Sequence, residues 1–287
     1  MQVTDYLHAL KIPFHIPVAP GKNVERFVYV YLILGEEISL VDSGVRDSDG
    51  LIYEYLKNLG RKPEDISLLI LTHAHPDHIG SAGAIRDSTG CRVAAHPGAR
   101  AWIEDVDLQF KERPVPGFQT LVGGNATVDH LLQDGEIMDL GPVSFEMLHT
   151  PGHAAGAVSL YSREEKLLIA GDAVPLKNSL PIYEDAATTV RSIERLKDLP
   201  GINMLLASWA APARAAEATK MLDEGLEYMQ YIHGVIRKIA GGKMADDDPM
   251  ELCAQVVKAL GLPDVAVNPL VARSFVSHLR VIDREEL

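Results

Sequence analysis

The stretch Thr72-His73-Ala74-His75-Pro76-Asp77-His78 follows directly on the apolar run Ile66–Leu71. Such a run is typical of a strand buried on both faces of a sheet. Its polar continuation therefore lies at a sheet edge, where loops carry functional side chains. Imidazoles and a carboxylate are the ligands of zinc, iron or manganese rather than of calcium or magnesium. A lone histidine is usually a satisfied core residue, but this density, in a loop that Pro76 restricts, indicates a metal site.

Other polar segments also follow apolar runs: Asp42-Ser43-Gly44, His149-Thr150-Pro151-Gly152-His153 and Gly171-Asp172. Because each follows a predicted strand, we expect each at a sheet edge where loops gather. The pattern predicts strands over 27–34, 38–41, 66–71, 91–95, 135–140, 143–148, 157–161, 167–170 and 202–206. It predicts helices over 51–59, 79–85, 188–199, 213–240, 250–260 and 269–281. Strands therefore end near residue 206, and the remainder is helical.

Taken together, these motifs resemble the signature of the metallo-β-lactamase superfamily in order and spacing. His-x-His-x-Asp-His at 73–78 carries the likeness, which extends over roughly residues 20–212. The resemblance implies an α/β fold, a four-layer αββα sandwich, with metal ions at one edge of the two sheets. We accordingly predict a catalytic domain over 1–212 and a helical C-terminal region over 213–287 that covers the active site. The substrate subfamily is not identified.

The resemblance also assigns the ligands. His73, His75 and His153 would hold a first metal, Asp77 and His78 a second, and Asp172 would bridge the two. Asp42 would orient ligands through hydrogen bonds. We expect one or two divalent metal ions, with zinc ahead of iron or manganese.

One position departs from the family pattern. Where the family has its last histidine ligand, this chain has Trp209, within Leu205-Leu206-Ala207-Ser208-Trp209-Ala210. An indole cannot bind a metal, so the second site would bind its ion weakly, bind another metal or stay empty. His278, and after it His233, are candidates for a replacement ligand, although an ordinary helix histidine is the simpler interpretation of each.

The chemistry expected of such a site is hydrolysis. A bound metal lowers the pKa of its water to about 7, and the metal-bound hydroxide would attack a carbonyl while Asp77 orients the water and moves its proton. We predict a hydrolase of a small-molecule ester, lactone or thioester. The alternative is a catalytically weak relative that binds a ligand or senses a metal. Trp209, Tyr183 and His278 are candidate substrate-binding residues, and Arg273 and Arg280 could face an anionic substrate.

The composition of the chain indicates which classes of binding partner to expect. The 287-residue chain carries a formal net charge of −13 and no basic run, which disfavours nucleic acid. Its two cysteines exclude a structural zinc finger and a disulfide framework. No N-terminal leader and no membrane span is recognisable, so we expect a cytoplasmic protein without membrane association. A small-molecule substrate is expected, and a homodimer is left open.

Overall fold

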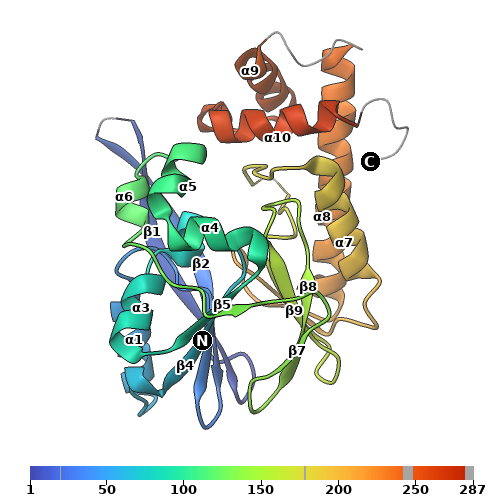
Figure 1. The fold of residues 1–287 in the computed structure, drawn as a ribbon. Helices are drawn as coiled ribbons and strands as arrows, with labels where there is room; N and C mark the ends of the chain where they lie inside the picture. The colour runs from blue at the N-terminus through green and yellow to red at the C-terminus, as the bar shows by residue number, and fades with distance from the viewer. Residues whose placement is uncertain (20, 178, 242–247, 282–287) are drawn as a thin grey trace.

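Two six-stranded sheets form the centre of the protein (Figure 1). The computed structural model describes residues 1–19, 21–177, 179–241 and 248–281. The first sheet has the order β1-β2-β3-β4-β5-β6, with β1 Leu7–Ala19, β2 Lys22–Leu34, β3 Ile38–Val41, β4 Ile66–Leu71, β5 Arg92–Ala95 and β6 His130–Leu131. The second has the order β12-β11-β10-β9-β8-β7, with β12 Ala213–Arg214, β11 Met204–Ala207, β10 Leu167–Gly171, β9 Val158–Ser162, β8 Ser144–His149 and β7 Ile137–Asp139.

Helices cover both outer faces of this pair of sheets (Figure 1). On the side of the first sheet lie α1 Ser48–Asn58, α2 Pro76–Ile79, α3 Ala82–Thr89, α4 Pro97–Glu104, α5 Val106–Glu112 and α6 Phe118–Leu121, with the short turn η1 Pro63–Asp65. On the side of the second lie α7 Ala186–Lys197 and α8 Ala216–Ala240. The remaining helices are α9 Pro249–Leu260 and α10 Pro269–Leu279, joined by η2 Asp264–Ala266.

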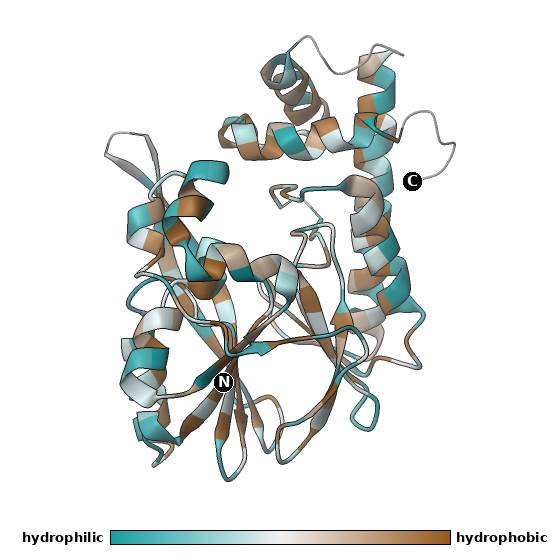
Figure 2. Cartoon of the chain, in the orientation of Figure 1, coloured by the Kyte–Doolittle hydropathy of each residue, from teal (hydrophilic) through white to brown (hydrophobic). Residues whose placement is uncertain are grey.

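Three apolar layers hold this arrangement together, and they confirm the predicted αββα sandwich. Alternate residues of one strand enter different layers, because side chains alternate across a strand. Leu69 packs under the helices α1 and α3, whereas Ile70 packs between the sheets. In β10, Ile169 faces the other sheet and Leu168 faces α7 and α8. Figure 2 shows this core as hydrophobic colour along the strands.

The topology brings the functional strand ends to one edge. β3 and β4 are parallel, as are β10 and β11, so the residues that follow each pair emerge together. At this edge the backbone N–H of Val158 donates to the carbonyl oxygen of Thr72 at 2.8 Å, which joins the two sheets. The polar segments after β4 and β10 therefore face each other.

The C-terminal helices form a separate apolar cluster, with Ile232 of α8, Val256 of α9 and Phe275 of α10 at its centre. This region is helical as predicted, except that Ala213 and Arg214 pair with β11 as the edge strand β12. The predicted boundary after residue 212 thus falls directly before a strand of the second sheet. No helix in the described ranges is both long and apolar enough to cross a membrane.

Two local predictions need correction. The pattern does not predict β1, because Pro13 and Pro17 interrupt it. β1 is an edge strand, and such strands tolerate proline since one side of their backbone needs no partner. The helix predicted over 79–85 is split into α2 and α3 at Gly80. The N–H of Gly80 donates to Gly44 at 2.8 Å, and a side chain there would strike neighbouring backbone.

Candidate metal centre

Three histidines converge where β4 ends and the loop between β8 and β9 returns. One ring nitrogen from each of His73, His75 and His153 lies within 4.8 Å of the others. All three side chains are buried. His75 Nδ1 and His153 Nε2 are 2.8 Å apart. These are the residues that the sequence predicted for the first metal.

The ring orientations leave one nitrogen of His73 and of His153 pointing inward. His153 Nδ1 donates to the carbonyl oxygen of Ile182 at 2.8 Å, so its Nε2 carries the lone pair. His73 Nδ1 lies 3.1 Å from Thr72 Oγ1. Hydrogen bonds of this kind fix the tautomer of a ligating imidazole.

Asp42 organises the next ligand position. Its Oδ2 accepts from His78 Nδ1 at 2.8 Å, and its Oδ1 accepts from the backbone N–H of Thr72 at 2.8 Å. Asp42 has φ 64, a conformation that non-glycine residues seldom adopt. Such strain persists only where the surrounding contacts impose it, and here the carboxylate contacts do so. The predicted orienting role of Asp42 agrees with these bonds.

A second group of donors adjoins the first. Nitrogens of His73 and His78 and an oxygen of Asp172 also lie within 4.8 Å of one another. His78 Nε2 is 3.5 Å from Asp77 Oδ2 and 3.5 Å from Asp172 Oδ1. His153 Nε2 is 3.3 Å from Asp172 Oδ2, so Asp172 reaches both groups. The structure thus brings all six predicted metal ligands together, while their role as ligands stays a prediction.

Burial and neighbouring charges determine the protonation of the histidines in both donor groups. Burial, reinforced by neighbouring positive groups, holds the pKa of His73 and His75 well below its ordinary value, and burial also lowers the pKa of His153. Burial opposes a charge on His78 too, but the carboxylates of Asp42, Asp172 and Asp77 outweigh it and raise the pKa of His78 well above its usual range. A metal ion binds a neutral imidazole, so the lowered pKa values of His73, His75 and His153 favour metal binding by the first group.

The donor set fits a metal ion. Buried side-chain atoms are nearly always hydrogen-bonded, so each exception asks for an explanation. Five buried atoms of this cluster lack a partner among the described residues: His73 Nε2, His75 Nε2, Asp77 Oδ2, His78 Nε2 and Asp172 Oδ1. All five belong to residues predicted as metal ligands. One or two divalent cations with nitrogen and oxygen ligands account for this concentration.

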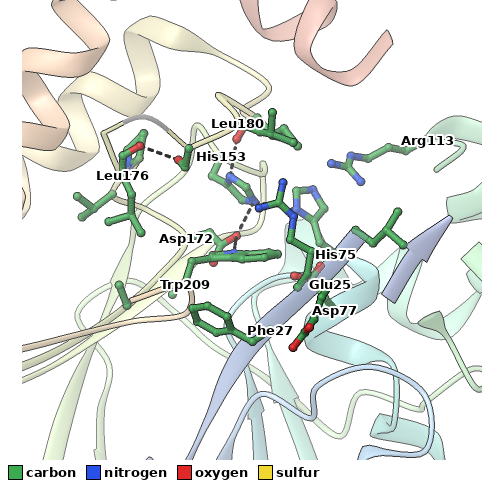
Figure 3. A pocket seen from close by; sticks show the side chains of 18 residues that line it. Glu25, Phe27, His75, Asp77, Arg113, His153, Asp172, Leu176, Leu180 and Trp209 are labelled. Atoms are coloured by element: carbon green, nitrogen blue, oxygen red, sulfur yellow. Dashed lines mark hydrogen bonds and ion pairs between the residues drawn. The ribbon is translucent and has the colours of Figure 1, made fainter. Parts of the chain in front are cut away.

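A cavity of about 300 Å³ opens onto these donors (Figure 3). His75, Asp77, His153 and Asp172 form its floor, and Phe27 of β2 with the apolar side chains at positions 174–176, 180 and 182 forms much of its wall. Trp209 lines it, and its Nε1 donates to Asp172 Oδ2 at 2.9 Å, while its predicted role in substrate binding stays a prediction. The indole N–H is therefore a hydrogen-bond donor to one of the two carboxylate oxygens of Asp172.

Comparison with known proteins decides the family. The sequence model of the metallo-β-lactamase superfamily matches residues 23–201. The chain belongs to this superfamily. A probable metallo-hydrolase of Bacillus subtilis is 34% identical over 163 residues, covering 55% of this chain and 69% of that protein. The protein is thus a metallo-hydrolase of the metallo-β-lactamase superfamily.

Further members of the superfamily extend the likeness. A hydroxyacylglutathione hydrolase of Methylococcus capsulatus is 32% identical over 130 residues, which cover 45% of this chain but only 42% of that enzyme. An acyl-coenzyme A thioesterase of Gallus gallus is 28% identical over 194 residues, 59% of this chain and 66% of that one. A metallo-β-lactamase family protein of Thermus thermophilus shares the fold, with a TM-score of 0.76, 24% identity, and coverage of 97% of this chain and 94% of that one.

Two of the predicted substrate-binding residues, Tyr183 and His278, do not lie at the cavity of this metallo-hydrolase. Tyr183 and His278 are buried, at 2% and 0% exposure, and neither lines the cavity. The Tyr183 hydroxyl lies 2.6 Å from His278 Nε2, and His278 Nδ1 lies 3.3 Å from His233 Nδ1. Their placement against each other also removes His278 and His233 as replacement ligands. Sequence alone could not show this, because it depends on how α8 packs against α10.

Other predictions about the C-terminal region change as well. Arg273 and Arg280 are exposed and do not line the cavity. Among the described residues, none after Trp209 lines it, so the C-terminal helices do not form its wall. Instead, α10 contacts the segment that carries part of the cavity wall. Ser274 Oγ accepts from the N–H of Tyr183 at 2.9 Å, next to Ile182, whose carbonyl oxygen accepts from His153 Nδ1.

The residue that sequence reasoning missed is Arg113. It lines the cavity and is 9% exposed. No motif marks it, because it follows the short helix α5 in a stretch without clear periodicity. A four- to eight-residue helix offers too few positions for a periodic pattern.

Proposed function

We propose that the protein hydrolyses a thioester of a small organic acid with one zinc ion bound by His73, His75 and His153. The observation that carries this is the convergence of unpartnered imidazole nitrogens and of Asp77 on a cavity of about 300 Å³. That volume suits a small molecule. The hydroxyacylglutathione hydrolase and the acyl-coenzyme A thioesterase support a thioester as the substrate class.

Each residue of the centre has a distinct task. His73, His75 and His153 offer three nitrogen ligands, and three protein ligands with an open position are typical of catalytic zinc. A zinc ion bound there supplies a Lewis acid that activates water and polarises a carbonyl group. The second donor group keeps Asp77, His78 and Asp172, but Asp172 Oδ2 already accepts from Trp209 at 2.9 Å. We therefore assign one ion to the site.

Asp77 is the proposed general base. It lines the cavity, and its buried Oδ2 has no hydrogen-bond partner in the described part of the chain. That oxygen accepts the proton of the attacking water and holds it during the reaction. Asp172 and His78 keep the neighbouring positions fixed through the contacts described above.

The leaving group discriminates between thioesters and oxygen esters. A thiol has a pKa near 8.5, so a thiolate departs without a strong proton donor. An alkoxide is a much stronger base than a thiolate and departs more slowly unless it is protonated. The described cavity wall offers no tyrosine, lysine or cysteine for this purpose, since Tyr183 and His278 lie outside it. Because a thiolate departs more readily than an alkoxide, our proposal takes a thioester ahead of an ester or a lactone.

The test compares substrates and one carboxylate. Protein stripped with a chelator and reloaded with zinc is assayed with N-acetylcysteamine thioesters, the matching oxygen esters and a set of lactones. We expect thioesters to be hydrolysed fastest and only after reloading. Asp77→Asn should lower kcat by about 10²- to 10⁴-fold and keep its zinc.

Glu25→Gln is the matched control, because Glu25 is an exposed carboxylate at the same cavity. Its activity should stay close to that of the wild type. Absence of turnover with every compound, despite full zinc loading, would favour the alternative function in which the protein binds a ligand or senses a metal.

A further inference from the structure

Arg113 is a buried cation without a partner among the described residues. Its side chain lines the cavity at 9% exposure, and Figure 3 shows the guanidinium pointing into the cavity. In the described part of the chain no carboxylate lies within ion-pair distance of it and no oxygen accepts a hydrogen bond from it. A buried arginine is usually paired, since an unpaired charge in the interior is strongly unfavourable.

The position of Arg113 is fixed relative to the metal centre. One turn earlier, the buried Gln109 donates through Nε2 to the carbonyl oxygen of Ala74, between His73 and His75. The N–H of Arg113 donates to the carbonyl oxygen of Gln109 at 2.8 Å and closes this turn of α5. Residues four apart lie on the same helix face. Gln109 thus anchors α5 to the metal-binding loop and sets Arg113 beside it.

Neighbouring carboxylates do not neutralise Arg113 by direct contact. Asp77 and Glu184 influence it most among the acidic groups. Glu184 Oε2 accepts instead from the N–H of Ala155 at 2.9 Å, and Asp77 Oδ2 faces His78 Nε2. An arginine stays protonated at neutral pH even when burial lowers its pKa. The cavity therefore presents a fixed positive charge next to a site suited to a cation.

We propose that Arg113 binds a carboxylate on the acyl chain of the substrate, so that the substrate is the monothioester of a short dicarboxylic acid. The inference rests on the proposed thioesterase function and specifies its substrate. A guanidinium binds a carboxylate through two parallel hydrogen bonds. The apolar side chains of Leu176, Leu180 and Ile182 line the same cavity and give it apolar surface that an acyl chain can contact.

The test measures binding without turnover. The probe is the thioether analogue of succinyl-N-acetylcysteamine, in which a methylene replaces the thioester carbonyl, and its partner carries a terminal carboxamide in place of the carboxylate. Calorimetric titration of the zinc-loaded protein should show about 10- to 100-fold tighter binding of the carboxylate, the range of one charge-assisted contact. A phosphonate of the same length should bind less tightly than the carboxylate.

Two variants test whether Arg113 causes the preference for the carboxylate probe over the carboxamide probe. Arg113→Gln should bind both probes with equal affinity while its zinc content stays at the wild-type level. Arg273→Gln is the matched control: Arg273 is an exposed arginine that influences Arg113 but does not line the cavity. It should keep the full preference.

Three outcomes would overturn the proposal. They are equal affinity of the wild type for carboxylate and carboxamide, a preference that persists in Arg113→Gln, and tighter binding of the phosphonate. Because the probes are not hydrolysed, failure of the thioesterase assay leaves this test intact. Conversely, hydrolysis of neutral thioesters without any carboxylate preference would overturn this proposal alone.

Discussion

At the scale of single residues, three of the predicted ligands, His73, His78 and His153, are each held through one ring nitrogen. Asp42 orients His78, Thr72 lies against His73, and the carbonyl of Ile182 orients His153. Partners of this kind set the tautomer and raise the basicity of a ligand. The affinity of the site should therefore depend on residues that never touch the ion.

Asp42→Asn tests this dependence. The asparagine keeps the size of the side chain but removes the charge that accepts from the N–H and the hydroxyl of Thr72, whose Oγ1 lies 3.1 Å from Nδ1 of the predicted ligand His73. We expect the zinc dissociation constant to rise about 10- to 100-fold, measured by competition with a chromophoric chelator. Asp129→Asn is the control, because Asp129 also accepts a backbone N–H, from Val93 at 2.9 Å, but lies outside the site. Equal zinc affinity of the Asp42 variant and the wild type would contradict the orienting role.

We expect Trp209 to limit the centre to one metal ion, because it stands where the superfamily has its last histidine ligand. Trp209→His replaces a hydrogen-bond donor to Asp172 by a nitrogen ligand and should raise the metal content from about one to about two ions per chain, measured by elemental mass spectrometry after zinc loading. Trp209→Phe removes the N–H without adding a ligand and should stay at about one. If the histidine variant also stays at one, Trp209 does not stand where the missing ligand belongs.

At the scale of elements, α10 braces the loop that carries the cavity wall. Ser274 bonds the backbone of Tyr183, Ser277 Oγ accepts from the N–H of Ala186 at 3.0 Å, and His278 lies against the Tyr183 hydroxyl. Burial lowers the pKa of His278 to about 3. The imidazole is consequently neutral in the folded protein across the physiological range.

This predicts a pH dependence of stability. The folded pKa of His278 lies below its unfolded value near 6.5, so between these values the unfolded chain binds the extra proton and the folded state loses stability as pH falls. The loss is about 1.4 kcal/mol per pH unit. In urea unfolding, the advantage of the wild type over His278→Gln should shrink by about 2 kcal/mol between pH 7 and pH 5. A constant difference would show that His278 is not shielded from protonation.

Elements with a strong periodic signal could be predicted from the sequence, and weaker ones could not. β4 was predictable to the residue, because a continuous apolar run ends at the polar motif. The helices α4 to α6 have few periodic positions, and β1 contains prolines that only an edge strand tolerates.

At the scale of the whole molecule, the cavity joins segments that are far apart in the chain, from β1 to the residues after β11. The convergence of the six candidate ligands was predictable because they lie in short polar motifs that follow apolar runs. Arg113 was not, because its burial depends on the bond between Gln109 and Ala74. Tyr183 and His278 were misplaced for the same kind of reason, since tertiary packing alone turns them away from the cavity.

The central claim is that His73, His75 and His153 hold one divalent metal ion. The direct measurement is the metal content per chain of wild type and His75→Ala, by elemental mass spectrometry on protein purified without added metal or chelator. We expect about one ion in the wild type and close to none in the variant, with both proteins folded by circular dichroism. Wild-type metal content in His75→Ala, or two ions per wild-type chain, would contradict it.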